Sequence, residues 1–104
     1  MTEHKYNVYV DPVVNDRMLY HVRFLARVSI PAAERLYDAL VKAIDELENN
    51  PKGCPKYTST TLTGVELRYK LCYKRYRIVF EIENNNVYVY DIQDCRQDTD
   101  KNLL

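Results

Sequence analysis

The chain has 104 residues, with fifteen basic and fifteen acidic side chains and therefore no formal net charge at neutral pH. A composition of 46% hydrophobic and 29% charged residues excludes an intrinsically disordered chain, and the length predicts one compact domain over residues 1–104. Because there is no run of eighteen apolar residues and Met1–Lys5 lacks the apolar segment of a signal peptide, we expect a cytoplasmic protein without a membrane partner.

The first predicted elements are a strand and a helix. The segment Tyr6–Val10 alternates and is rich in β-branched and aromatic residues, which indicates a strand. Asp11 then provides a helix N-cap, and Pro12 occupies the first helical position. Apolar residues at helical spacing extend this helix to about Val28. They are Val14, Met18, Val22, Leu25 and Ala26.

A second helix follows with almost no linker, which predicts an antiparallel helical hairpin. Ser29 is placed to cap this helix, and Pro31 lies in its first turn. The segment Asn49–Pro51 ends it, because the residue before a proline avoids helical backbone. The apolar stripe of the helix consists of Ala33, Leu36, Tyr37, Leu40, Ile44 and Leu47.

The second half of the chain is a loop followed by three strands. Gly, Pro, Ser and Thr residues mark Lys52–Gly64 as the loop. A basic strand follows, then a strand over Tyr76–Glu83. Asn84–Asn86 is a turn, because Asn tolerates left-handed backbone, and Val87–Ile92 is the last strand.

The order β-α-α-β-β-β predicts an α+β fold. The last three strands are joined by short turns and should form an antiparallel meander, to which the first strand adds at the edge or in the middle. We expect the helical hairpin to pack on one face of this small antiparallel sheet and to leave the other face open.

The predicted hairpin Leu67–Phe80 is the most informative segment, because it carries five of the fifteen basic residues. Side chains alternate along a strand, so Arg68 and Lys70 share one face of the first strand. Arg77 lies early in the second strand, and the apolar residues of that strand lie on its other face. We therefore expect Arg68, Lys70 and Arg77 to stand together on the open face, as a cationic surface that can hold phosphate.

The distribution of charge leaves a plainer interpretation open. Residues 56–80 contain six basic residues and one acidic residue, whereas residues 81–101 contain six acidic and two basic residues. A basic hairpin is thus followed by an acidic tail, and the zero total counts against a nucleic-acid binder. The basic residues are then the charges of a solvated sheet face, which also resist aggregation.

The cysteines and histidines predict no metal or cofactor site. Cys54, Cys72 and Cys95 are widely spaced and odd in number, which is typical of reduced cysteines rather than of a disulfide framework. His4 and His21 are too few and too distant to complete a metal site.

Several segments together carry a resemblance to a known family. They are Leu47–Pro51 at the end of the second helix, Leu62–Gly64 before the basic strand, Tyr76–Phe80 within the next strand, and Asp91–Asp98 at the end of the last strand. In this order and at this length, the chain resembles the RelE/ParE superfamily of bacterial toxins from type II toxin–antitoxin systems, over nearly its whole length.

The resemblance implies a toxin that is bound by a cognate antitoxin. RelE-like members are ribosome-dependent endoribonucleases that cut mRNA, and we expect this activity, with mRNA on the ribosome as the substrate. ParE-like members share the fold and inhibit DNA gyrase without enzymatic activity, which is the alternative. A non-toxic binding module with the same fold is a further alternative.

For the endoribonuclease, the resemblance assigns roles to four basic residues. Arg68 and Lys70 lie nine and seven positions before Arg77, as the basic residues of RelE-like enzymes do. Arg77 and Arg68 would clamp the phosphate, and Lys70 would be a third clamp or a base. Arg96 would contact the phosphate from the other side. The reaction needs no metal, because fixed cations offset the charge that develops on the phosphate.

The end of the chain departs from this pattern. RelE-like enzymes generally carry a Tyr or His near the C-terminus, and neither residue follows Arg96 here. For Arg96, an ion pair with Asp91, Asp94 or Asp98 is an alternative to a catalytic role. This departure favours the gyrase-directed alternative, or an inactive member of the family.

Overall fold

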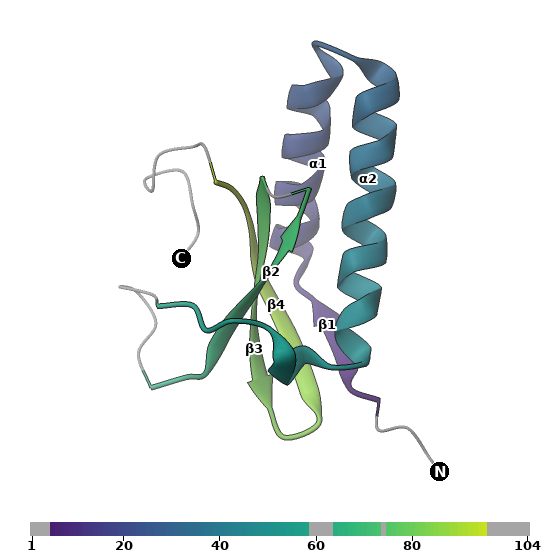
Figure 1. Cartoon of the computed structure of the whole chain (residues 1–104). Coiled ribbons are helices and arrows are strands. Elements are labelled where there is room, and N and C mark those ends of the chain that lie inside the picture. The colour runs from purple at the N-terminus through teal and green to yellow at the C-terminus, as the bar shows by residue number, and fades with distance from the viewer. Residues whose placement is uncertain (1–4, 59–63, 74, 96–104) are drawn as a thin grey trace.

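The computed structural model describes residues 5–58, 64–73 and 75–95. Its helices and strands follow the predicted order β-α-α-β-β-β (Figure 1). They are β1 (Asn7–Val10), α1 (Pro12–Ala26), α2 (Ile30–Asp45), β2 (Leu67–Cys72), β3 (Tyr76–Glu83) and β4 (Asn86–Asp94). Two short 3-10 helices, η1 (Glu46–Glu48) and η2 (Pro51–Gly53), lie between α2 and β2.

The four strands form one mixed sheet in the order β1-β4-β3-β2. The predicted meander is confirmed, because β3 pairs antiparallel with both β2 and β4. The expectation of an entirely antiparallel sheet is wrong at one edge, where β1 pairs parallel with β4. The cause is the long connection through both helices, after which β2 runs in the same direction as β1. Two antiparallel turns then bring β4 back to that same direction.

The helical hairpin begins at the predicted caps. The Asp11 carboxylate accepts a hydrogen bond from the Val13 amide at 2.9 Å, and the Ser29 hydroxyl accepts one from the Ala32 amide at 3.2 Å. These bonds satisfy amides that have no partner within their own helix. Both helices end slightly earlier than predicted, α1 at Ala26 and α2 before the 3-10 turn η1.

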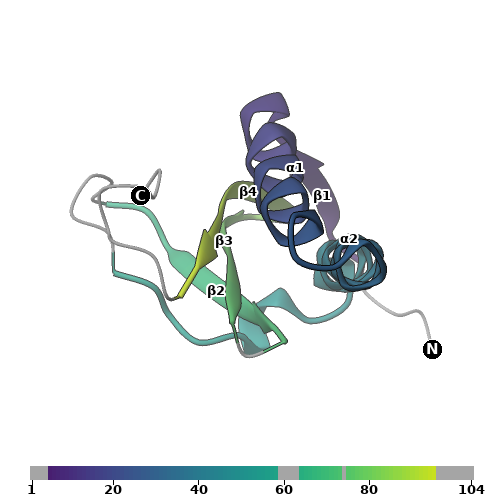
Figure 2. The ribbon, with the colours of Figure 1, turned by 90° about the horizontal axis from the view of Figure 1, so that it is seen from above.

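The core lies between the helical hairpin and one face of the sheet. Figure 2, which looks along the helices, shows α1 and α2 on the same side of the strands. The residues buried in this layer come from both helices and from the three longer strands, as amphipathic patterning requires. They include Val14, Met18, Leu36, Leu40, Ile78, Phe80, Val87, Val89 and Ile92. None of the described helices is long and apolar enough to cross a membrane.

The segment after η2 lies along the outer edge of β2. The Tyr57 amide donates to the Leu67 carbonyl at 2.9 Å, and the Tyr69 amide donates to the Pro55 carbonyl at 3.0 Å. Backbone groups that an edge strand would expose are thereby paired. The segment also brings the Tyr57 side chain to the sheet face turned away from the helices, which we call the far face.

Candidate functional site

The register of the β2–β3 hairpin separates the three predicted basic residues. Arg68 stands opposite Phe80 and Lys70 stands opposite Ile78, so both lie on the face that carries the core. Arg77 stands opposite Leu71, on the far face. Directly opposed residues in an antiparallel pair point to the same side of the sheet. The expectation that Arg68, Lys70 and Arg77 share one face is therefore wrong.

Arg68 and Lys70 are held by Glu66 just before β2, by the Cys54 carbonyl after η2, and by Glu46 just after α2. The Arg68 Nε atom lies 2.9 Å from a Glu66 carboxylate oxygen, and its Nη1 atom donates to the Cys54 carbonyl at 2.7 Å. Lys70 Nζ lies 3.0 Å from a Glu46 carboxylate oxygen. The hydrogen bond from Lys70 and its charge lower the pKa of Glu46. Both side chains thus attach β2 to the segments that follow α2.

Arg77 occupies a different environment on the far face. Its guanidinium carbon lies 5.8 Å from the centroid of the Tyr57 ring and 5.9 Å from that of the Tyr69 ring. Cations are attracted to the faces of aromatic rings at such distances. Its Nε atom is buried and has no hydrogen-bond partner among the described residues, and none of their carboxylates forms an ion pair with it. Arg77 is therefore a cation held mainly by tyrosines.

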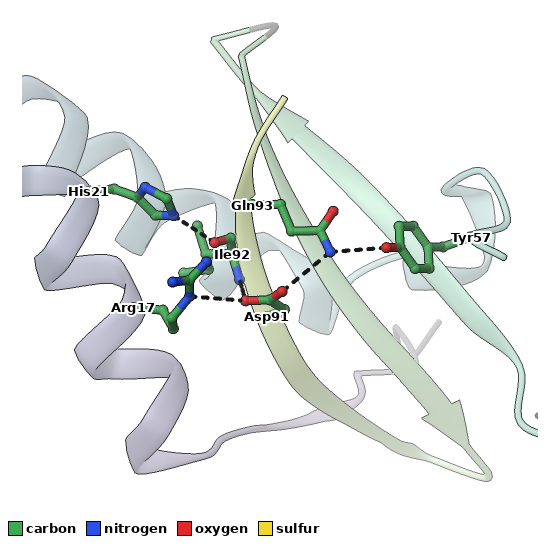
Figure 3. Close-up of polar contacts among 6 residues, drawn as sticks. All are labelled: Arg17, His21, Tyr57, Asp91, Ile92 and Gln93. Carbon is green, nitrogen blue, oxygen red and sulfur yellow. Dashed lines mark hydrogen bonds and ion pairs between the residues drawn. The ribbon is translucent and has the colours of Figure 1, made fainter. Parts of the chain in front are cut away.

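A buried polar network links α1 to the far face (Figure 3). The Asp91 carboxylate is fully buried, accepts a hydrogen bond from the Ile92 amide at 2.8 Å, and lies 3.5 Å from Arg17 Nε. The Gln93 side-chain amide donates to Asp91 at 3.2 Å and to the Tyr57 hydroxyl at 2.9 Å. The hydrogen bond to its hydroxyl fixes the Tyr57 side chain, whose ring faces Arg77.

Sequence reasoning did not find this network. It considered Asp91 only as one of three alternative ion-pair partners of Arg96, whereas in the structure the Asp91 carboxylate lies beside Arg17. Asp94 likewise contacts Arg75, at 3.2 Å. Arg96 itself lies outside the described residues, so its assigned role stays a prediction. The available signal was an acidic residue inside an otherwise apolar strand, because a carboxylate is rarely buried without a partner.

The far face also carries acidic groups. Glu81 and Glu83 alternate with core residues along β3, on the same side as Arg77. The Tyr90 hydroxyl hydrogen-bonds to Glu81, which raises the pKa of Tyr90 to about 12. This phenol stays protonated at neutral pH and is not available as a base. Within residues 5–58, 64–73 and 75–95, no three His, Cys, Asp or Glu side chains are placed to hold a metal ion.

His21 joins α1 to the end of β4. It is 2% exposed, and its Nε2–H donates to the Ile92 carbonyl at 2.7 Å. Burial lowers the pKa of His21, the Arg17 charge lowers it further, and the hydrogen bond and the carboxylates of Asp91 and Asp94 oppose this shift. The neutral imidazole is therefore the form that the fold favours.

This environment predicts a loss of stability in mild acid. Below the ordinary pKa of 6.5 the unfolded chain binds a proton at His21 that the folded chain does not bind. We expect the contribution of His21 to the free energy of unfolding to be constant above that pH and to fall as the pH drops, by at most about 1.4 kcal/mol per unit. Urea unfolding of the wild type and of His21→Gln, from roughly pH 5 to about pH 8, measures this pH dependence of the free energy of unfolding. An equal slope in both proteins would contradict it.

Comparison with known proteins gives one family and one fold. A model of the family described as "ParE toxin of type II toxin-antitoxin system, parDE" matches residues 12–99. A solved structure titled "Chromosomal ParDE TA system from P. aeruginosa" has a TM-score of 0.69 and 10% sequence identity. The alignment covers 88% of this chain and 98% of that chain. At this identity the likeness concerns the fold alone. No curated protein matches.

Proposed function

The chain belongs to the ParE toxin family of type II toxin–antitoxin systems, and from this premise we propose that it arrests growth by binding DNA gyrase rather than by cutting mRNA. As a toxin of such a system it has a cognate antitoxin as its partner. A gyrase target places its site of action in the cytoplasm. The observation that carries the choice between the two activities is the separation of Arg77 from Arg68 and Lys70.

The separation removes the arrangement on which the endoribonuclease depends. Metal-free RNA cleavage requires several cations that converge on one phosphate as its charge increases. Arg68 and Lys70 lie on the core side of the sheet, each with a carboxylate partner, whereas Arg77 lies on the far face. Among the described residues, the three side chains cannot contact one phosphate without a change in the strand register.

The chemistry of the far face supports the same choice. Glu81 and Glu83 share this face with Arg77, and carboxylates repel a phosphate backbone. Tyr90, held protonated by Glu81, offers no base to accept the proton of a ribose hydroxyl. A surface of this kind is suited to contacts with a protein rather than with RNA.

The helical hairpin offers a surface for a protein target. Ile30 and Tyr37 are 65% and 42% exposed, and they line a hollow of about 380 Å³ between the two helices. Val28, at the connection between the helices, is 83% exposed. Exposed apolar side chains gathered next to a hollow are typical of protein interaction sites. We propose that gyrase contacts the toxin through this hairpin.

Substitution of Arg77 distinguishes the two activities. We expect induced wild-type chain and Arg77→Ala to arrest bacterial growth equally and to induce the DNA-damage response. In both cases primer extension on a translated mRNA should show no new 5′ ends, because no phosphate is cleaved. Purified gyrase should lose supercoiling activity in the presence of either protein.

The control for this experiment is the antitoxin. Arg77→Ala that still binds the co-expressed antitoxin is correctly folded, so its toxicity can be compared with that of the wild type. Cuts at codon boundaries that disappear in Arg77→Ala would overturn the proposal and favour the endoribonuclease. Growth arrest with intact mRNA and fully active gyrase would point to a different target.

A further inference from the structure

The outward side of α1 carries a surface that the sheet and α2 do not cover. Val13, Tyr20 and Phe24 are 51%, 42% and 46% exposed, although they are large and apolar. Their spacing of seven and then four residues places them along one side of the helix. In Figure 2, α1 has α2 on one flank and the strands on another, and a third side faces outward.

Charged residues complete this surface. Asp16, Arg23 and Arg27 are exposed and, with Tyr20 and Phe24, line a hollow of about 260 Å³. The Arg27 guanidinium lies 5.7 Å from the centroid of the Phe24 ring, which restricts both side chains. Within the described part of the chain, neither Asp16 nor Arg23 has an ion-pair partner. We call the five residues that line this hollow the α1 outer face.

The charges of the α1 outer face are arranged so that the face complements itself. Its acidic residue, Asp16, lies before Tyr20 in the helix, and its two arginines lie after it. Two copies of such a face match when the helices run antiparallel, and their macrodipoles then also oppose each other favourably. We propose that the protein forms a symmetric dimer with a second copy of itself, through antiparallel contact of the two α1 helices centred on Tyr20.

Helix geometry gives the contacts of this dimer. With a rise of 1.5 Å per residue, Asp16 lies about 6 Å before Tyr20, and Arg23 and Arg27 lie about 4.5 and 10 Å after it. A two-fold axis at Tyr20 therefore places Asp16 of one copy level with the space between Arg23 and Arg27 of the other. These three residues share one flank of the helix, so the carboxylate enters the hollow between the two guanidinium groups.

The size of the α1 outer face predicts a weak dimer. The helix has fifteen residues, which corresponds to a length of about 22 Å. A contact of this length buries less than the roughly 1,600 Å² of a standard stable interface. We therefore expect a dissociation constant in the micromolar range, on the order of 10 µM. The dimer would be populated at high local concentration and would dissociate on dilution.

Charge reversal tests the dimer. Sedimentation equilibrium of the purified full chain should show a monomer–dimer equilibrium. Asp16→Arg and Arg23→Glu should each weaken association roughly tenfold, because each places like charges opposite one another. The double variant restores opposite charges and should return to within about threefold of the wild type. Asp38→Arg, an identical charge change on the exposed side of α2, should leave association unchanged.

Other outcomes overturn the proposal. A chain that is monomeric at about 200 µM, twenty times the expected constant, forms no such dimer. A dimer that the single reversals do not weaken, or that the double variant does not rescue, uses a different surface. If the reversals weaken binding of the antitoxin but not self-association, the α1 outer face belongs to the antitoxin instead. None of these outcomes depends on whether gyrase is the target.

Discussion

Replacement of Asp91 by Ala is expected to lower the free energy of unfolding by about 3–5 kcal/mol, the range for removal of one partner from a buried ion pair. The Asp91 side chain is fully buried, lies 3.5 Å from Arg17 Nε, and accepts hydrogen bonds from the Ile92 amide and the Gln93 side chain. Alanine offers none of these acceptors. The Arg17 side chain is 20% exposed and can regain some water, which places the effect toward the lower end.

Urea unfolding at pH 7 measures this loss. Asp91→Asn keeps one acceptor oxygen and should fall between the wild type and Asp91→Ala. Asp38→Ala, at an exposed aspartate on α2, should change the free energy of unfolding by less than about 0.5 kcal/mol. If Asp91→Ala proved as stable as Asp38→Ala, the buried network would contribute nothing to the attachment of α1 to β4.

The second large effect concerns Phe80. We expect Phe80→Ala to lower the free energy of unfolding by about 3–5 kcal/mol, because the ring is completely buried and its removal leaves a cavity. Phe80 lies in β3, between β2 and β4, and faces the helical hairpin from the middle of the sheet. Its neighbours belong to different elements, which limits how far they can close the cavity.

The only other phenylalanine of the chain provides the matched control. Phe24 is 46% exposed on α1, so Phe24→Ala removes the same atoms without leaving a cavity. We expect it to cost less than about 1 kcal/mol in dilute protein, and Phe80→Leu to cost less than Phe80→Ala. Thermal unfolding monitored by circular dichroism compares the three variants. Equal losses for Phe80→Ala and Phe24→Ala would contradict the proposed position of the core.

The elements of the fold could be predicted from sequence because their signals are local. Asp11, Ser29 and Asn84 act on backbone groups only a few residues away, and the structure shows them at two caps and a turn. The direction of β1 could not be predicted in this way. Its partner β4 is distant in the chain, and alternating apolar residues are the same for a parallel and an antiparallel edge strand.

The expectation that Arg68, Lys70 and Arg77 share one face was wrong for a related reason. Alternation along each strand of the hairpin was correctly predicted, but alternation does not say which face of one strand meets which face of the next. The pairing of Leu71 with Arg77 decides this, and it depends on the turn between the strands. The apolar residues of β2 were assumed to join the core. Leu67 is buried, but it lies opposite Glu81 on the far face and not against the helices.

The pairing of β1 with β4 has a consequence for the order in which the protein can form during synthesis. Asn7 and Asn86 are neighbours across this pair although they are 79 positions apart in the sequence. During synthesis, β1 can therefore pair with β4 only after both helices, β2 and β3 have been made. Such late closure costs more loop entropy than local pairing and slows folding. The complete sheet can therefore form only after both helices and all four strands have been synthesised.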